Sequence, residues 1–309
     1  MLQSAKGLDY LHGQKRPIVH KDLKPENILL SNGTKNVKLA DFGLSKELKD
    51  GETSFTKTVS CTELWTSPEF LDPMLASKRH YTEVDIFSLG CVYFFVYTGI
   101  HPFGDMSSRR QNIVKNIHSD IAEYLHDKFF NVGILDYQEN LYQYKELADL
   151  ILKMIAAKDR LTTMTILDHP LFWTIDMRIN FFKRTKDILC DVSNKALLEK
   201  LETEKSVLIG QSSWHELLEP HVKEWWTIST PKQKRGGKRR VYKDTLLDLI
   251  FCIRNTYEHI KEQPNAVREK IGKSIENNEY WIKKYPNLLI GIYNYLNEFL
   301  TGTQILPML

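Results

Sequence analysis

The sequence contains few cysteines, and their spacing offers no pair for a metal site or a disulfide framework. No two of the four form a CxxC motif, and long stretches of chain separate Cys61, Cys91, Cys190 and Cys252. Disulfide-rich secreted scaffolds and structural zinc sites both need closely and regularly spaced cysteines. We therefore expect reduced thiols in a cytosolic protein.

Long hydrophobic runs are also missing. The longest uncharged apolar stretch, residues 86–100, is shorter than the ~20 residues that a membrane-spanning helix needs. Near the amino terminus, Lys6 and Asp9 interrupt any apolar run of the kind that a signal peptide contains. The sequence therefore predicts no membrane segment and no secretory signal in this chain.

The overall composition is that of a globular protein with a substantial core. Of the 309 residues, 42% are hydrophobic and 26% are charged, which excludes a disordered chain and a collagen. A chain of this length usually folds as two domains. The segment of Pro, Phe and Trp residues at 169–173 marks a corner after which the hydrophobic pattern changes. We expect one domain over residues 1–173 and a second over residues 174–303.

Positive charge is concentrated in one segment. Residues 228–243 contain seven lysines and arginines and no acidic residue, and without these seven, 35 basic residues remain against 39 acidic ones. A Gly- and Pro-containing loop with this charge suits a polyanion, and nucleic acid in the first place. A solvated surface loop or an import signal explains the same charges equally well. The basic residues are Lys232, Lys234, Arg235, Lys238, Arg239, Arg240 and Lys243.

Hydrophobic periodicity predicts a mainly α-helical chain. Apolar residues recur at helical spacing from Leu2 to Leu11. Residues 37–40 form an expected strand, because an Asn-Gly turn precedes this apolar run. Residues 84–97 are apolar on every side, which predicts a buried helix. Further helices are expected over residues 146–157, 178–192, 194–202, 245–262 and 288–300.

Four short motifs follow one another in the first half of the chain. Residues 20–27 read His-Lys-Asp-Leu-Lys-Pro-Glu-Asn, and an Asp-Phe-Gly triplet at residues 41–43 follows the expected strand. A Ser-Pro-Glu triplet at residues 67–69 ends a polar loop, and Asp85 begins the buried helix. This order and spacing resemble the catalytic loop, the metal-binding triplet and the later segments of the carboxy-terminal lobe of a protein kinase.

The kinase resemblance implies a role for each polar residue of these motifs. Phosphoryl transfer depends mostly on positioning and electrostatics, and two magnesium ions would need oxygen ligands, here Asn27 and Asp41. Asp22 would orient the acceptor hydroxyl, and Lys24 would neutralise the transferred phosphoryl group. In the kinase cleft of the parent protein, Lys24, Asn27 and Asp41 would together hold ATP or ADP with its magnesium.

Two features depart from the kinase pattern. The chain begins inside the helix before the catalytic loop, without a Gly-rich phosphate loop or the Lys–Glu pair of an amino-terminal lobe. As given, it is expected neither to bind ATP tightly nor to phosphorylate a substrate, and we interpret it as a piece of a larger protein. Lys21 stands where the family usually has arginine, and it can still contact, as a point charge, a phosphate on Ser54, Thr56 or Ser60.

One helix in the second half of the chain carries a distinctive polar face. On a helical wheel, Asn255 and His259 lie within about 20° of Asp248, opposite the face that holds leucines and isoleucines. Arg254 lies to one side, and Tyr242 precedes the helix. This set suits metal-free RNA cleavage, in which a base takes the 2′-hydroxyl proton, an acid protonates the 5′-oxygen and a cation stabilises the phosphorane. Similar polar faces are also common on surface helices that have no catalytic role.

The order of residues in this region is similar to that of a second known kind of domain. Ile-Arg-Asn at residues 253–255 and Glu-His at residues 258–259 follow a kinase-like lobe, and Glu-Trp-Trp-Thr at residues 224–227 precedes the basic segment. Together they resemble the kinase-extension nuclease domain of two related families. One is the inositol-requiring transmembrane kinase/endoribonuclease that senses unfolded protein in the endoplasmic reticulum, and the other is RNase L. The resemblance covers essentially the whole chain.

The nuclease resemblance implies roles for individual residues. His259 would act as general acid or base, and Arg254 would bind the scissile phosphate. Asn255 and Tyr242 would position or activate the 2′-hydroxyl, and Asp248 would orient its neighbours. No metal or other cofactor is expected for this nuclease. The expected RNA contacts are Trp226, Lys234, Arg235, Lys238, Arg239 and Arg240.

The resemblance implies a kinase lobe (residues 1–173) followed by a nuclease domain (residues 174–303), of the unfolded-protein-sensor type. In these families the nuclease works as a dimer or higher oligomer, so the expected partners are RNA, nucleotide and a second copy of the chain. The expected location is the cytosol, at the cytosolic face of the endoplasmic reticulum membrane for a transmembrane parent. Three alternatives stay open: an RNase L-like nuclease with a pseudokinase scaffold, an RNA-binding module without turnover, and a kinase with an unrelated helical tail.

Overall fold

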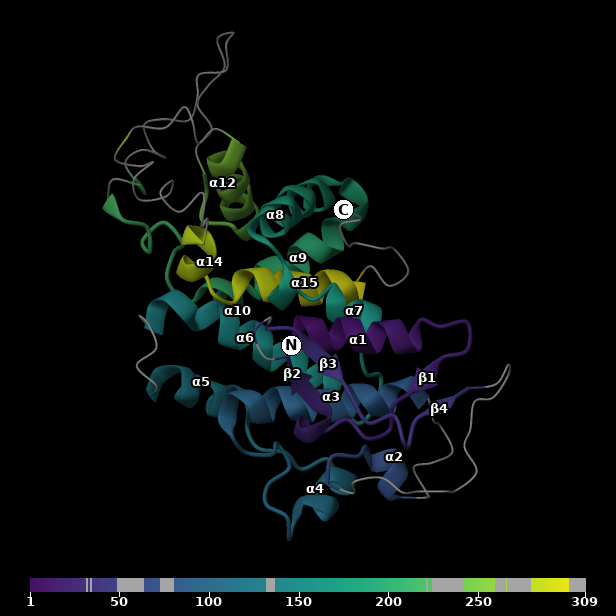
Figure 1. The fold of residues 1–309 in the computed structure, drawn as a ribbon. Helices are drawn as coiled ribbons and strands as arrows, with labels where there is room; N and C mark the ends of the chain where they lie inside the picture. Colours follow the sequence, from purple (N-terminus) through teal and green to yellow (C-terminus); the bar gives the residue numbers. More distant parts are fainter. Residues whose placement is uncertain are drawn as a thin grey trace, which may run out of the picture. The chain divides into compact units, whose positions relative to one another are not determined.

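The computed structural model describes residues 1–31, 33, 35–48, 64–72, 81–131, 137–220, 222–223, 242–258, 265 and 279–299 (Figure 1). The chain divides into two compact units. The first comprises Met1–Tyr137 and Glu146–Phe172, and the second comprises Gln138–Lys145 and Trp173–Leu309. Among the helices of the described residues, none combines the length and the apolar character needed to cross a membrane.

The first unit is mainly helical and contains two short antiparallel sheets. In one sheet β1 pairs with β4, with Ile18 opposite Glu47. In the other, β2 pairs with β3, with Ile28 opposite Leu39. The elements are α1 (Leu2–His12), β1 (Ile18–Val19), η1 (Pro25–Asn27), β2 (Ile28–Leu30), β3 (Val37–Leu39), β4 (Lys46–Glu47), α2 (Pro68–Leu71), α3 (Tyr81–Thr98), α4 (Arg109–Lys115), α5 (Ile121–Asn131), α6 (Tyr137–Met154), α7 (Thr163–Leu167) and η3 (Pro170–Phe172).

Helix α3 forms the centre of the first unit. Every residue from Val84 to Phe94 is buried, which confirms the helix expected from the apolar run. A Cβ atom on Gly90 would lie 2.8 Å from Cβ of Met154 and 2.9 Å from Cγ2 of Ile155. The absence of a side chain at Gly90 therefore allows the end of α6 to approach α3 closely.

Helix α6 is longer than the sequence predicts, because it begins at Tyr137 rather than at residue 146. Its first half belongs to the second unit, where Tyr142 is only 4% exposed. The hydroxyl of Tyr142 donates to Oε1 of Glu279 at 2.7 Å. Apart from Leu141, this half consists of tyrosines and polar residues, and for that reason its periodicity is weak in the sequence.

Over its described residues, the second unit contains helices and connecting loops and no strand. Helix α8 begins three residues earlier than expected, because the hydroxyl of Thr174 accepts a hydrogen bond from the amide of Met177 and caps the helix. The three described cysteines of the chain are free. The elements are α8 (Ile175–Cys190), η4 (Val192–Asn194), α9 (Lys195–Thr203), α10 (Lys205–Ile209), α12 (Leu246–Glu258), α14 (Tyr280–Lys284) and α15 (Leu288–Phe299).

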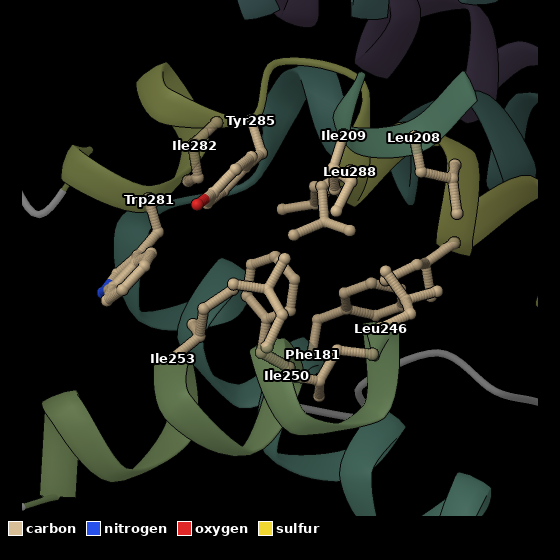
Figure 2. Close-up of a cluster of buried hydrophobic side chains, with 14 of the residues drawn as sticks. Phe181, Leu208, Ile209, Leu246, Ile250, Ile253, Trp281, Ile282, Tyr285 and Leu288 are labelled. Carbon is tan, nitrogen blue, oxygen red and sulfur yellow. The ribbon is translucent and has the colours of Figure 1, made fainter. Parts of the chain in front are cut away.

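The core of the second unit forms around α12. Its apolar face points toward α14, α10 and α15, and Leu246, Ile250 and Ile253 meet Trp281 and Leu288 there (Figure 2). Helices α8 and α9 also pack against α12. The core face predicted for the helix that begins near residue 245 is thereby confirmed. This packing fixes the orientation of α12 and, with it, the direction of its polar face.

Candidate active sites

The loop at residues 20–22 adopts its shape around one buried carboxylate. Lys21 has φ = 66° and Asp41 has φ = 61°, a left-handed backbone conformation that is uncommon outside glycine. The two oxygens of Asp85 accept hydrogen bonds from the backbone amides of His20 and Lys21, each at 2.8 Å. Oδ2 of Asp85 also lies 2.9 Å from Nε2 of His12. Asp85 does not begin the buried helix, as the sequence predicts, because α3 already begins at Tyr81; from the second turn of α3 its carboxylate holds the loop at residues 20–22.

Three residues of the loop contact one another directly. Nζ of Lys24 lies 2.8 Å from Oδ2 of Asp22, and Nδ2 of Asn27 donates to the same oxygen at 3.0 Å and to the backbone oxygen of Asp22 at 2.7 Å. The hydrogen bond to Asp22 raises the pKa of the Lys24 ammonium. Asp22 and Asn27 are each 6% exposed. The structure thus brings together Asp22, Lys24 and Asn27, as the motif predicts.

Asp41 lies beside this group in the fold. The backbone amide of Ala40 donates to the backbone oxygen of Asn27 at 2.9 Å, which joins the two segments. The amide of Gly43 donates to Oδ1 of Asp41 at 3.3 Å. Because the amide nitrogen of Asn27 faces Asp22, its oxygen is turned away from that carboxylate. A carboxylate and an amide oxygen on adjoining segments are the donors that Mg²⁺ accepts, so Asn27 and Asp41 fit that ion.

Of the proposed contact between Lys21 and a phosphorylated residue, the structure describes the lysine and not its partner. Burial, together with the nearby Lys46, lowers the pKa of the Lys21 ammonium, although Asp85 acts in the opposite direction. Two lysines close together form a small positive region in the first unit. The candidate phosphorylation sites Ser54, Thr56 and Ser60 lie outside the described residues.

In the second unit, three of the predicted nuclease residues form a chain of hydrogen bonds. Nδ2 of Asn255 donates to the hydroxyl oxygen of Tyr242 at 2.6 Å. Nη1 of Arg254 donates to Oδ1 of Asn255 at 2.9 Å. All three side chains are half-buried. The Asn255 amide therefore connects the phenol to the guanidinium and orients both groups.

Arg254 also has an acidic neighbour that the sequence reasoning missed. Nη2 of Arg254 lies 2.9 Å from Oε2 of Glu258, one helical turn further along α12. Oε1 of Glu258 in turn lies 3.6 Å from Nζ of Lys183 on α8. The spacing of four residues between Arg254 and Glu258 is the signal that identifies this pair. An anion that binds Arg254 would compete with Glu258 for the guanidinium.

Asp248 does not lie on an exposed face of α12, contrary to the helical-wheel expectation. It is only 8% exposed, because its Oδ2 accepts a hydrogen bond from the backbone amide of Lys243 at 2.7 Å and the preceding loop covers it. Its own amide donates to the hydroxyl of Thr245 at 3.1 Å, which caps α12. Burial, and after it the nearby carboxylate of Asp248, raises the pKa of the Cys252 thiol. Asp248 thus fixes the turn that leads from Tyr242 into the helix.

Other predicted residues lie outside the part of the chain that the structure describes. They include the imidazole that was expected to be the acid or base, and the residues of the basic segment. Within the described residues, no cluster of three or more His, Cys, Asp or Glu side chains is arranged to hold a metal ion. The undescribed candidates are His259, Trp226, Lys234, Arg235, Lys238, Arg239 and Arg240.

Three features define the class of the first unit. They are the loop held by Asp85, the contacts among Asp22, Lys24 and Asn27, and the adjoining turn at Asp41. The chain belongs to the protein kinase family, since the family described as "protein kinase domain" matches residues 1–172. A second family, described as "Ribonuclease 2-5A", matches residues 178–308.

Whole-length relatives combine the same two parts. The chain is 30% identical to the serine/threonine-protein kinase/endoribonuclease ire-1 of Caenorhabditis elegans, over 99% of this chain and 30% of that protein. It is 31% identical to the serine/threonine-protein kinase/endoribonuclease IRE2 of Homo sapiens, over 99% of this chain and 31% of that protein. It is 29% identical to the Schizosaccharomyces pombe protein named "Sensor for unfolded proteins in the ER ire1", over 97% of this chain and 28% of that protein.

These matches confirm the order predicted from the sequence, a protein kinase segment followed by an endoribonuclease segment. They also confirm the mainly helical fold class. The chain spans less than a third of the length of these relatives.

Proposed function

We propose that this chain is the kinase and nuclease portion of an unfolded-protein-sensor kinase/endoribonuclease, and that its second unit cleaves RNA without a metal ion. The observation that carries the proposal is the hydrogen-bonded chain from Tyr242 through Asn255 to Arg254. It joins a phenol and a guanidinium, two groups that can move a proton and hold a phosphate. The names of the relatives that match over the whole chain support the same activity.

The cleavage can be written with the groups of α12 and of the residues beside it. Arg254 binds the scissile phosphate and stabilises the charge that builds up on it. Tyr242 and Asn255 orient the 2′-hydroxyl, and a base removes its proton as the 2′-oxygen attacks phosphorus. His259 supplies acid–base catalysis, and the departing 5′-oxygen takes up a proton. The products are a 2′,3′-cyclic phosphate and a free 5′-hydroxyl.

In this proposal, the basic segment at residues 228–243 binds the RNA. Seven lysines and arginines within residues 228–243 provide the positive field, and Trp226 can stack on an unpaired base. Because phosphate contacts release counterions, RNA affinity should fall steeply as salt rises.

The kinase unit serves as a nucleotide-dependent assembly module in this proposal. In a longer parent protein that also supplies an amino-terminal lobe, Lys24, Asn27 and Asp41 would help to hold a nucleoside diphosphate or triphosphate, and the magnesium ion, when bound, would neutralise phosphate charge. Asp22 would orient a hydroxyl acceptor. Two copies of the chain would then bring their nuclease units together, so that each supplies part of the wall around one RNA phosphate. We propose a cytosolic location, at the face of the endoplasmic reticulum membrane in a transmembrane parent.

A cleavage assay on the full chain tests the nuclease. A 5′-labelled stem-loop RNA is incubated with the chain in excess EDTA, and the ends of the products are identified. We expect cleavage that persists in EDTA and yields a 2′,3′-cyclic phosphate. Arg254→Lys keeps the charge but loses the planar fork, so it should lower kcat/KM by roughly 10²-fold.

The matched control is Lys195→Met, which removes an equally charged side chain that is 77% exposed on α9. It should cleave like the unchanged chain. Binding of the RNA without cleavage would favour the RNA-binding module instead. Complete loss of activity in EDTA would contradict metal-free chemistry, and full activity in a strictly monomeric sample, measured by sedimentation, would contradict the assembly requirement.

A further inference from the structure

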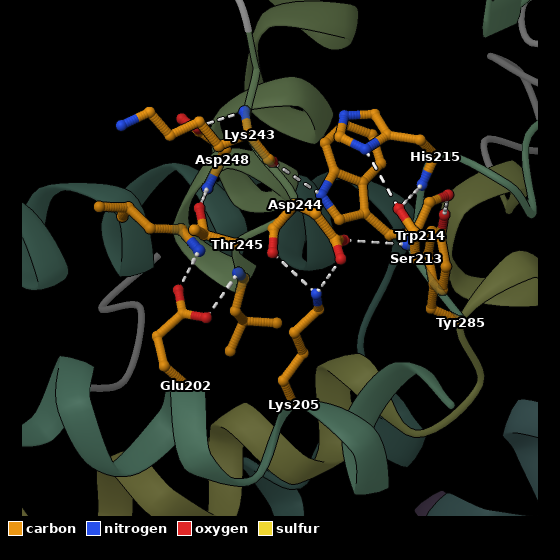
Figure 3. A network of polar contacts seen from close by, with 12 residues as sticks. Glu202, Lys205, Ser213, Trp214, His215, Lys243, Asp244, Thr245, Asp248 and Tyr285 are labelled. Carbon is orange, nitrogen blue, oxygen red and sulfur yellow. Dashed lines mark hydrogen bonds and ion pairs between the residues drawn. The ribbon is translucent and has the colours of Figure 1, made fainter. Parts of the chain in front are cut away.

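The segment just after Tyr242 is tied to a buried tryptophan in another part of the second unit (Figure 3). The backbone amide of Trp214 donates to Oδ1 of Asp244 at 3.2 Å, and its indole Nε1 donates to the backbone oxygen of Lys243 at 3.1 Å. Trp214 is fully buried, and its own backbone oxygen accepts from the hydroxyl of Tyr285 at 2.8 Å. Two consecutive residues of the loop are therefore fixed to one core residue, Lys243 to the indole of Trp214 and Asp244 to its backbone amide.

A lysine holds the same segment from the opposite side. Nζ of Lys205, at the start of α10, donates to the backbone oxygen of Asp244 at 2.8 Å and lies 2.7 Å from its Oδ2. Burial raises the pKa of the Asp244 carboxyl, but hydrogen bonds from Lys205 and from the Trp214 amide outweigh it, and the pKa is lowered. Asp244 is therefore ionised at neutral pH, and each of its carboxylate oxygens has a donor from a different element. Charge-assisted bonds of this kind are stronger than neutral ones.

The main chain of Tyr242 is held as well. The ring of His215 stacks on Trp214, with the ring centroids 3.8 Å apart, and it is hydrogen-bonded to the backbone of Tyr242. The backbone amide of Lys243 donates to Asp248 at 2.7 Å. Every residue from Tyr242 to Asp244 thus has at least one contact that restricts its position. The hydroxyl of Tyr242 then meets Asn255 at 2.6 Å.

We propose that Asp244 is a positioning residue for the nuclease site, which sets the place of the Tyr242 hydroxyl by docking the loop onto Trp214 and Lys205. This inference rests on the proposed RNA cleavage. Asp244 does not reach Tyr242 through its own side chain; it acts through the backbone two residues along the chain. A displacement of about 1 Å at a reacting group can cost about 10²-fold in rate, so a residue that only holds the loop can control turnover.

A double-mutant cycle on the full chain separates positioning from simple stabilisation. Asp244→Ala, Tyr242→Phe and the double variant are compared for kcat and KM on one stem-loop RNA. We expect Asp244→Ala to lower kcat by about 10-fold at an unchanged KM, and Tyr242→Phe to lower it by about 10²-fold. The double variant should be no slower than Tyr242→Phe alone, because Asp244 acts only through the phenol. Losses that multiply in the double variant would overturn the proposal.

A second pair of variants guards against misfolding at Asp244. Lys205→Met removes the ammonium that contacts the backbone oxygen and Oδ2 of Asp244, with a side chain of similar length, and Lys205→Arg keeps a cation that can donate to both. Lys205→Met should reproduce the fall in kcat, and Lys205→Arg should restore most of it. Equal losses in both variants, or a loss in the exposed control Lys195→Met, would contradict the positioning role.

Hydrogen exchange gives a readout that does not depend on cleavage. The amide of Lys243, bonded to Asp248, should exchange at least several-fold faster in Asp244→Ala, while amides in α15 keep their rates. Unchanged exchange at Lys243 would overturn the positioning role even if the chain cleaves RNA. A third result is also informative: the unchanged chain does not cleave RNA, but the Lys243 amide exchanges faster in Asp244→Ala. That result would refute the proposed function and would limit the role of Asp244 to shaping the loop.

Discussion

The two candidate sites are supported in different ways. In the kinase-type unit, Asp22, Lys24 and Asn27 lie within six residues of chain, and three groups that shape the loop converge on one buried carboxylate, that of Asp85. In the nuclease-type unit, the loop after Tyr242 depends on several groups, none of which holds it alone. They are Lys205, Trp214, His215 and Asp248, and Glu202 accepts the first amides of α12, which follows the loop.

This difference predicts different responses to mutation. A site in which several groups donate to one buried carboxylate should lose much of its stability when that carboxylate is changed, because more than one hydrogen bond is affected at once. A site with distributed support should lose a little at each position and keep its fold. Each of the following changes tests one side of that comparison.

The largest effect is expected at Asp85. Asp85→Asn keeps the volume, but it places an amide NH₂ near groups that donate, namely the backbone amides of His20 and Lys21 and the ring of His12. Asp85 is fully buried, so the loss cannot be compensated by water. We expect the free energy of unfolding of the first unit to fall by about 3 kcal/mol, measured by denaturant titration.

Asp127→Asn is the control for that measurement. Asp127 has a 63% exposed side chain and pairs only loosely with His126, so its change should alter stability by less than about 0.5 kcal/mol. Hydrogen exchange should also rise around residues 20–22 in Asp85→Asn and not in the control. Equal stability of the two variants would show that the catalytic loop has other supports and that the comparison does not hold.

The sequence predicts the kinase-type site better than the nuclease-type site, and the reason is physical. Asp22, Lys24, Asn27 and Asp41 are close in the chain, and a motif of fixed spacing encodes their contacts directly. The apolar repeats of α3 and α12 likewise predict buried helices, because periodicity reports burial without reference to partners.

What the sequence did not predict depends on contacts between distant segments. Nothing near Trp214 or Lys205 indicates that each binds a loop some 30 or 40 residues further on, since a tertiary contact leaves no spacing signal. A helical wheel placed Asp248 on an exposed face, because a wheel ignores the loop that covers it. The Arg254–Glu258 pair, in contrast, was open to prediction from its spacing of four residues.

The stability of the two units should also differ in its dependence on pH, and the expected effect is of intermediate size. Burial, with Arg109 nearby, lowers the pKa of His101 in the first unit from 6.5 to about 3. The unfolded chain binds a proton at this position below about pH 6.5, whereas the folded chain stays neutral until about pH 3. The stability from neutral His101 is therefore full above pH 6.5 and is lost as pH falls, by about 1 kcal/mol between pH 7 and pH 5.5.

His101→Asn isolates this contribution. Asparagine can still accept the hydrogen bond that the amide of Phe103 donates to Nδ1 at 3.2 Å, but it does not titrate. The free energy of unfolding of the variant should depend less on pH over that range, as measured by denaturant titration at each pH. In the second unit the half-buried His215, whose pKa burial also lowers, should give a smaller change in His215→Asn. The reverse order would mean that acid acts mainly on the nuclease-type unit.

The smallest effect is expected where support is distributed. The carboxylate of Glu202 on α9 accepts the first amides of α12, those of Leu246 at 3.0 Å and Leu247 at 3.1 Å (Figure 3). Glu202→Gln loses the charge at a helix amino terminus and one of the two acceptors, so the free energy of unfolding should fall by about 1 kcal/mol. Glu199→Gln, on the same helix with a 68% exposed side chain, should change it by less than half as much.

Because Lys205 and Trp214 still hold the loop, Glu202→Gln should speed exchange at Leu246 and Leu247 without altering RNA cleavage. If Glu202→Gln lost as much stability as Asp85→Asn, one carboxylate would matter as much in the second unit as in the first. The two sites would then not differ in how they are supported.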